Sequence, residues 1–491
     1  MSRILQSING VVWGAPALVL ILGVGIYLTV GTRAVQLRLF PRAIRTFFRQ
    51  FGRRKEEQQG VSSFRALCTA LAATVGTGNL AGVAGAIALG GPGAIFWMWV
   101  CGFLGMALKF AEATLAVRYR VKGKDGVYVG GPMYMIRRGM GEKWAWMGGL
   151  YAFFGVFAAF GVGNATQINA VVQSCGEMLL SLGIRPAGYF PVLLGIGLGI
   201  LVAVMLFGGA RRIGAAAEML VPLASVSYLL LGLGVLALRG DQIPRAFGQI
   251  VRGAFSPRAV TGGMLGSAFA ALRVGMSRGV FTNEAGMGTA SIAHAGAQVR
   301  DPMEQGMMGI VEVFVDTLVI CTMTALVILC SGVEIPYGTD PGVTLTVQAF
   351  SRIYGGWVSV YLSLALMCFA FATVLGWGLY GVRCAQYLLG EGAWKPFALL
   401  QAGVVVLGAV LQTGTLWTMS EIVNGLMAIP NLIALAALSH PLFAMTGRNR
   451  KFGGYCANGG TNESFNQCQS VRAVAHAQVP SPGGGGGGKG T

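Results

Sequence analysis

Long apolar stretches separated by short polar connections dominate the pattern of the chain. Runs of about 20 apolar residues have the length that a helix needs to cross a bilayer. The sequence predicts eleven membrane helices with no soluble domain between them. Their expected ranges are 9–31, 67–89, 93–117, 146–180, 188–207, 216–238, 262–280, 304–331, 357–380, 394–412 and 415–440. The first run is too long for a signal peptide and lacks a small-residue cleavage site.

Two of these predicted helices contain glycines and hydroxyl groups in mid-membrane. The second carries Ala-Ala-Thr-Val-Gly-Thr-Gly-Asn at 72–79, and the seventh carries Arg-Val-Gly-Met-Ser-Arg-Gly at 273–279. A break in a membrane helix survives only where it is buried or lines a cavity. One break lies in the first helix of the series 2–6 and the other in the first helix of the series 7–11. The two breaks therefore fit two five-helix repeats of opposite topology, with the substrate at the break. A tight helix crossing is the alternative for either segment taken alone.

The predicted architecture is an all-α integral membrane protein with four parts. Residues 1–66 form an additional membrane helix and a basic cytoplasmic connection, and 67–261 form the first five-helix repeat. Residues 262–440 form the second, inverted repeat. The tail at 441–491 is polar and ends in six glycines before Lys489, which is typical of a disordered segment with no transport role.

Composition supports a surface in contact with lipid. Of 491 residues, 54% are hydrophobic and only 11% charged, whereas soluble domains carry about 25% charged residues. The 77 glycines are more than twice the roughly 7% share of soluble chains. In membranes such small residues let helix backbones approach closely.

The net charge of +18 reflects topology rather than nucleic-acid binding. With the N-terminus outside and the C-terminus in the cytoplasm, 28 of the 36 lysines and arginines fall in cytoplasmic segments, as the positive-inside rule requires. One predicted outer loop runs against the rule, because it carries four arginines. They are Arg239, Arg245, Arg252 and Arg258.

Enzyme and channel chemistry find little support in the sequence. The nine cysteines form no Cys-X-X-Cys pair, and the three histidines are far apart, so no cofactor and no metal beyond a coupling ion is expected. No His-Glu-X-X-His motif marks an intramembrane enzyme. The breaks also lack the repeated carbonyl rings of a channel filter.

Four segments, at 73–87 (ATVGTGNLAGVAGAI), 278–288 (RGVFTNEAGMG), 313–317 (VFVDT) and 371–377 (FATVLGW), carry a family resemblance. They resemble the alanine or glycine:cation symporter family, also called sodium:alanine symporters. The similarity extends in order over about residues 10–440. It implies a leucine-transporter-type fold of the APC superfamily, with five plus five inverted helices and one extra N-terminal helix, in a bacterial or archaeal plasma membrane.

The resemblance implies secondary active symport of alanine or glycine with sodium into the cell by alternating access. Proton coupling and another amino-acid substrate on the same fold stay open as alternatives, and an intramembrane enzyme is a third. The sequence does not choose between D and L substrates, and it does not define the oligomeric state.

The resemblance also implies site residues. Around the substrate we expect Thr77, Gly78, Asn79, Gln167, Asn164, Phe269, Leu272, Gly275 and Trp377. Around the cation we expect the carbonyls of Ala72, Val75 and Ala370 and the hydroxyl of Thr373, since hard oxygen ligands suit sodium. Gln167 has an interhelical hydrogen bond as its alternative role, and Trp377 has ordinary packing.

An acidic pair, Glu312 and Asp316, lies one turn apart within the predicted eighth helix. Charges in a membrane are usually paired or functional. The sequence favours ion pairs with Arg273 or Arg278, and a cation or proton pathway is the alternative. The segment at 283–284 is expected in a cytoplasmic loop, as part of an inner gate.

Overall fold

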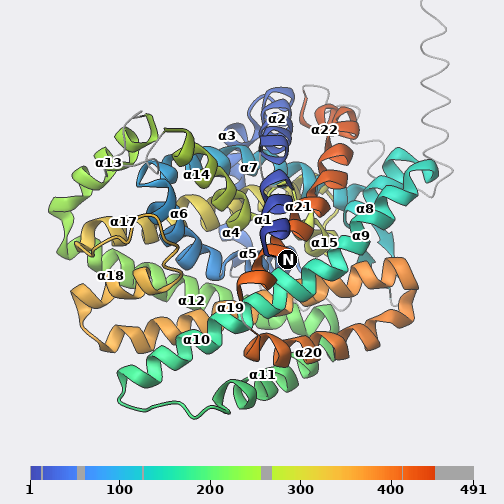
Figure 1. Ribbon diagram of the computed structural model, residues 1–491. Coiled ribbons are helices and arrows are strands. Elements are labelled where there is room, and N and C mark those ends of the chain that lie inside the picture. Colours follow the sequence, from blue (N-terminus) through green and yellow to red (C-terminus); the bar gives the residue numbers. More distant parts are fainter. Residues whose placement is uncertain are drawn as a thin grey trace, which may run out of the picture. The chain divides into compact units, whose positions relative to one another are not determined.

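Helices account for almost all of the computed structural model (Figure 1), which describes residues 2–12, 15–51, 61–123, 126–255, 268–411 and 413–447. The elements up to residue 255 are α1 Ser2–Val12, α2 Ala15–Gly31, α3 Val35–Arg38, α4 Phe40–Phe51, α5 Ser63–Thr74, η1 Gly78–Gly82, α6 Val83–Gly90, α7 Gly93–Arg118, β1 Val121–Lys122, β2 Tyr128–Val129, α8 Pro132–Met135, η2 Ile136–Met140, η3 Glu142–Trp144, α9 Ala145–Phe160, η4 Gly161–Ala165, α10 Thr166–Ser181, α11 Phe190–Phe207, α12 Gly209–Leu238, η5 Gly240–Gln242 and α13 Ile243–Phe255. The later elements are α14 Ala268–Asn283, α15 Thr289–Ala295, α16 Pro302–Val313, η7 Phe314–Cys321, α17 Thr322–Ser331, α18 Thr344–Tyr354, α19 Trp357–Leu389, η8 Glu391–Ala393, α20 Trp394–Val410, α21 Thr413–Ala437 and α22 Ser439–Thr446.

Nine helices in the described part of the chain are long and apolar enough to cross a membrane, or ten with the bent pair of α5 and η1–α6. The eleven expected spans coincide with these ten and with α14. By itself α14 is only 16 residues long, and the start of that expected span, 262–267, lies outside the described residues. The residues up to Leu442 form one unit, and those from Phe443 form a second. The tail expected at 441–491 lies almost wholly outside the described residues.

Large apolar side chains cover the outward faces of these helices. On α11, Leu193 and Ile200 are 60% and 63% exposed, and on α12, Leu223 and Leu230 are 66% and 64% exposed. In water such a surface would drive aggregation. In a bilayer it meets acyl chains of equal polarity, so the buried and lipid-facing sides of each helix are both apolar.

The first expected break is confirmed. Helix α5 ends at Thr74, Val75 is extended, and the chain resumes as a π-helical turn, η1, that leads into α6. The two halves are bent by 51°. Figure 1 places α5 among α12, α15 and α19, and it packs against all three, so the break is enclosed by protein as the bilayer requires.

The second expected break, at 273–279, is wrong, because α14 is helical through this segment. The break lies at 284–288, between α14 and α15. There Glu284, Gly286 and Gly288 all have positive φ angles, of 53°, 91° and 78°. Glycine adopts this backbone region without strain. The residues expected in a cytoplasmic loop, Asn283 and Glu284, are instead buried at this break, at 0% and 4% exposure.

Candidate functional site

The unwound turn between α5 and η1 frees one backbone carbonyl and gives it a new partner. In a continuous helix the Gly76 amide would donate to the Ala72 carbonyl, but here it donates to Asn79 Oδ1 at 2.9 Å. The Ala72 carbonyl accepts instead from Thr373 Oγ1, on α19, at 2.9 Å. The carbonyl of Ala72 and the hydroxyl of Thr373, both expected at the cation site, are therefore in contact.

Gln167, on α10, faces the same turn. Thr77 Oγ1 donates to Gln167 Oε1 at 3.1 Å, and the Gln167 amide donates to the Val162 carbonyl at 3.2 Å. A methyl group added at Gly76 would lie 2.8 Å from Thr373 Oγ1 and 3.5 Å from Gln167 Oε1. Three helices thus bring polar groups to one point beside a glycine, and these groups are buried.

A buried hydrogen-bonded chain connects the first break with the second. Asn79 Nδ2 donates to Asp316 Oδ1, on η7, at 2.7 Å, and Thr317 Oγ1 donates to Asp316 Oδ2 at 2.9 Å. Asn283 Nδ2 donates in turn to Thr317 Oγ1 at 3.2 Å. Asn283 Oδ1 then accepts from the Ala285 amide at 3.0 Å. The two breaks are therefore joined through side chains of one intervening helix.

The second break is held by Glu112, from α7. Its Oε1 accepts from the amides of Gly286 and Gly288 at 2.9 and 3.1 Å. Asn431, on α21, donates to the same oxygen and to the Gly286 carbonyl, both at 2.9 Å. Amide groups left without helical partners are thus satisfied by a buried carboxylate.

Trp377 lies against both halves of this region. Its Nε1 donates to Glu284 Oε1 at 2.9 Å, and Thr289 Oγ1 donates to Glu284 Oε2 at 2.6 Å. The indole also packs flush on Gly163, where an added methyl group would lie 2.3 Å from Trp377 Cβ. Trp377 therefore has a packing role and a polar contact, and its expected contact with the substrate stays a prediction.

A second buried network lies between α5, α7, α15 and α16. Ser63 Oγ donates to Gln305 Oε1 at 2.7 Å, so the Gln305 amide faces His294 Nδ1 at 2.6 Å. His294 Nδ1 must then accept, which puts the ring proton on Nε2, where it is donated to Glu312 Oε2 at 2.9 Å. Lys109 Nζ donates to Glu312 Oε1 at 2.9 Å, with both side chains 0% exposed.

The expected ion pairs between helix 8 acids and helix 7 arginines are therefore wrong. Glu312 pairs with Lys109, and Asp316 accepts from Asn79 and Thr317 without a basic partner within the described residues. Arg278 forms an ion pair with Asp340 at 2.8 Å. Arg273 and Arg278 both lie on α14 and not in a connection between helices.

Three of the residues expected around the substrate lie away from the first break. Phe269 is 71% exposed in the first turn of α14, about 20 Å from the helix end at 1.5 Å per residue. Leu272 is only half-buried and precedes the break by three turns. Gly275 packs directly on the Ala94 carbonyl of α7, so it serves a helix crossing. The helix that reaches the first break does so through Thr282, which contacts Gly78.

Asn164 makes a hydrogen bond between helices. Its Nδ2 donates to the Gln401 carbonyl, on α20, at 2.8 Å. This bond uses only the Nδ2 atom of Asn164, and the expected contact between Asn164 and the substrate stays a prediction.

Sequence reasoning missed Lys109, Glu112 and Glu284 as buried charges. A signal for the first two was present, since both fall one turn apart within a predicted membrane span, where charges are rarely accidental. Glu284 was misplaced because the second break was placed too early along the helix. Within the described parts, no group of His, Cys, Asp and Glu side chains is arranged to hold a metal ion.

A closed polar site at a broken membrane helix, enclosed by further membrane helices, is the architecture of a secondary transporter. Comparison with known proteins places the chain in a family. Residues 1–453 match the sodium:alanine symporter family, and the chain belongs to it. It is a multi-pass membrane protein for cation-coupled amino-acid symport.

Two relatives and one solved structure show the extent of the similarity. The sodium/alanine symporter AgcS of Methanococcus maripaludis is 41% identical over 443 residues, which cover 89% of this chain and 94% of that protein. The probable sodium/glutamine symporter GlnT of Bacillus subtilis is 37% identical over 458 residues, 90% of each chain. The structure of MhsT in complex with L-phenylalanine has a TM-score of 0.53 at 15% identity, covering 79% of this chain and 89% of that one. The expected leucine-transporter-type fold is confirmed.

Proposed function

We propose that the chain carries alanine or glycine into the cell together with a sodium ion by alternating access. The observation that carries this proposal is the convergence of Thr77, Gln167 and Thr373 on the unwound turn at Gly76. The proposed orientation has the N-terminus outside and the C-terminus in the cytoplasm. The relatives' names and the family support the substrate class.

The proposed substrate site uses the freed groups of the turn. Amide groups at the start of η1 suit the substrate carboxylate, and carbonyls and the Gln167 side chain suit its ammonium group. Thr77, Gly78 and Asn79 form one side, and Gly76 leaves the space between Gln167 and α19. Because these residues are already buried, a short side chain fits this space better than a long one.

The proposed cation site uses oxygens only. The carbonyls of Ala72, Val75 and Ala370 and the hydroxyl of Thr373 are hard ligands of the kind that sodium accepts. Ala370 precedes Thr373 by one turn of α19 and is 0% exposed. Bound sodium would replace the hydrogen bond from Thr373 to Ala72 with two bonds to the ion, linking α5 to α19 more firmly.

The direct test is uptake of labelled alanine into proteoliposomes that contain the purified protein. We expect accumulation when a sodium gradient is imposed, and none with potassium or with a proton gradient alone. Unlabelled glycine should compete and leucine should not. Glutamine belongs among the competitors, because one relative is named for it. Uptake of leucine at the alanine rate would overturn the small-substrate proposal, and proton-driven uptake would overturn the sodium proposal.

Thr373→Ala is expected to raise the sodium concentration for half-maximal uptake several-fold, because the variant loses one cation ligand. Thr324→Ala is a matched control. The Thr324 hydroxyl likewise donates to a backbone carbonyl four residues earlier, that of Ile320, and forms a hydrogen bond with the Tyr228 hydroxyl of a neighbouring helix. Sodium titrations of initial uptake rates compare the two. An equal change in both variants would mean that Thr373 serves packing and not the cation.

Gln167→Leu is expected to raise the KM for alanine at least about tenfold, the loss of one hydrogen bond to a charged group. Gln401→Leu is its control, because Gln401 is likewise buried and donates to a backbone carbonyl, that of Ala159. Alanine saturation curves at fixed sodium make the measurement. If Gln167→Leu and Gln401→Leu both keep the wild-type KM for alanine, Gln167 serves only as a hydrogen bond between helices.

A further inference from the structure

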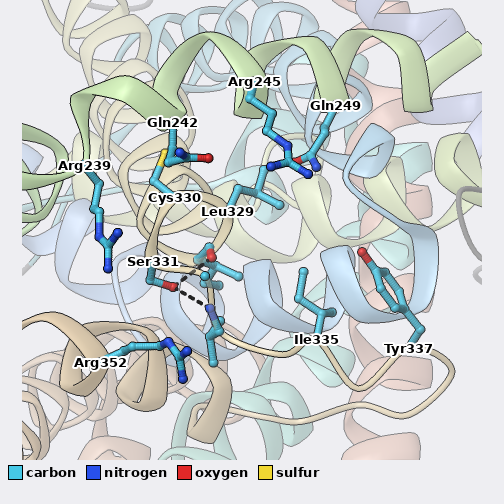
Figure 2. Close-up of a pocket in the computed structure, with 13 residues that line it drawn as sticks. Arg239, Gln242, Arg245, Gln249, Leu329, Cys330, Ser331, Ile335, Tyr337 and Arg352 are labelled. Carbon is cyan, nitrogen blue, oxygen red and sulfur yellow. Dashed lines mark hydrogen bonds between the residues drawn. The ribbon is translucent and has the colours of Figure 1, made fainter.

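A cavity of about 370 Å³ opens where α12 ends and α13 begins, away from both helix breaks. Figure 2 shows Arg239, Arg245 and Arg352 reaching into it from three different segments. Arg239 follows α12, Arg245 lies on α13, and Arg352 lies on α18. Gln242 and Gln249 add amide groups to the same wall. At about 30 Å³ per water molecule, the cavity has room for a ligand larger than a few waters.

The charge of this cavity is unbalanced. Its lining contains three arginines and neither aspartate nor glutamate. Within the described residues, none of the three forms an ion pair. Two acids, Asp241 and Glu334, are next to lining residues in the sequence but do not line the cavity, and Asp241 accepts from Gln242 at 2.6 Å. Two of the three arginines, Arg239 and Arg245, belong to the predicted outer loop that runs against the positive-inside rule. The charge that departs from the rule therefore lines the cavity in part.

Negative helix ends offset only part of the positive charge of the three arginines. The C-terminal ends of α12 and α17 lie at this cavity, and Arg352 Nε passes close to Gly332, which follows α17. Each helix end carries roughly half a negative charge, so two ends offset about one of three guanidinium groups. The lining itself keeps a surplus of about two positive charges, which the exposed neighbouring acids Asp241 and Glu334 reduce without lining the cavity.

The amphipathic helix α13, which lines the cavity, has the pattern of a helix that lies at the level of lipid headgroups. Its core face is Ala246, Ile250 and Ala254, all buried. An adjacent stripe is apolar and exposed, with Phe247 and Val251 at 40% and 46%. Such a helix lies in the interface plane, with its exposed apolar stripe toward acyl chains and its polar face toward headgroups.

We propose that this cavity, defined by Arg239, Arg245 and Arg352, binds a phosphate group. Guanidinium groups match phosphate oxygens in charge and geometry and bind them through paired hydrogen bonds. The phosphate comes from the headgroup of an anionic lipid or from free phosphate, and the exposed stripe on α13 favours the lipid. The site is independent of the transport proposal, since it shares no residue with the helix breaks.

The test is binding of phosphatidylglycerol to the full-length protein in detergent, followed by native mass spectrometry, with phosphatidylcholine as the uncharged reference and inorganic phosphate as competitor. Arg245→Gln and Arg352→Gln should each weaken phosphatidylglycerol binding about tenfold or more, through loss of one charge-assisted pair. Arg252→Gln is the matched control, because Arg252 lies on the same helix but outside the cavity lining. Its effect should stay within twofold. All three arginines are exposed, so the melting temperature without lipid should not change.

Each source of the phosphate gives its own result. Phosphatidylglycerol binding that inorganic phosphate does not displace identifies a lipid site, and displacement identifies a site open to free phosphate. Binding of inorganic phosphate alone, lost in Arg245→Gln, identifies the free anion. The proposal is overturned if phosphatidylglycerol binds no better than phosphatidylcholine and phosphate does not bind. It is equally overturned if Arg252→Gln weakens binding as much as Arg245→Gln.

Discussion

Gly76→Ala is expected to abolish sodium-driven alanine uptake and alanine binding while the protein stays folded. The added methyl group would lie 2.8 Å from Thr373 Oγ1 and 3.5 Å from Gln167 Oε1. It would therefore fill the space where the proposed substrate and cation groups meet. Gly76 is not among the glycines with positive φ, so alanine fits its backbone without strain. Alanine binding and melting temperature are measured on the same purified sample.

Gly82→Ala is the matched control for this substitution. It ends the π-helical turn that follows the break, and its added methyl group would make only an ordinary contact, 3.7 Å from Thr282 Cγ2. We expect it to retain uptake within about twofold. Loss of melting stability in Gly76→Ala with residual alanine binding would show that the glycine serves helix packing alone.

The neighbouring Gly78 lies in a different environment from Gly76. By sequence, both glycines belong to one motif. In the structure a methyl group at Gly78 would meet Thr282 at 3.1 Å, so a larger side chain there would push α14 away. A substitution at Gly78 would then disturb binding and packing together, whereas Gly76 faces polar groups of the site.

The first break could be predicted from the sequence because its signal is local. Glycines, a hydroxyl and an asparagine occur together within one apolar span, and the structure unwinds there. The same signal misplaced the second break, because glycine has two uses in a membrane helix. Gly275 and Gly279 lie against α7, at Ala94 and Cys101, and allow a close crossing. Gly286 and Gly288 supply the positive φ angles of the break.

The partners of the buried charges could not be predicted from local sequence. Lys109 and Glu312 are 203 positions apart, and their contact depends on how α7 packs against α16. The arginines considered as partners were closer in sequence, but Arg278 pairs with Asp340. Spacing along the chain identifies a charge in the membrane, and only the packing of helices identifies its counter-charge.

Removing the buried lysine is expected to destabilise the protein more than removing its partner acid. Among the buried residues of the described chain, Lys109 is the one lysine or arginine, while Glu112, Glu284 and Glu312 are within its electrostatic range. Lys109→Met therefore leaves three buried carboxylates without a basic counter-charge, at a cost of about 3–5 kcal/mol for an unpaired buried charge. Glu312→Gln leaves Lys109 with the other two acids, so its cost should be half of that or less.

Thermal unfolding of both single variants and of Lys109→Met/Glu312→Gln, in one detergent, measures this asymmetry. The double variant should recover part of the loss in Lys109→Met, because it removes one of the three uncompensated carboxylates and the two residues are in contact. The ranking of the three melting temperatures decides the test, and not the size of each difference, since any packing defect from Lys109→Met persists in the double variant. A melting temperature of Glu312→Gln at or below that of Lys109→Met would mean that Lys109 neutralises Glu312 alone. In that case Glu112 and Glu284 would be stabilised by their hydrogen bonds at the second break and not by the lysine.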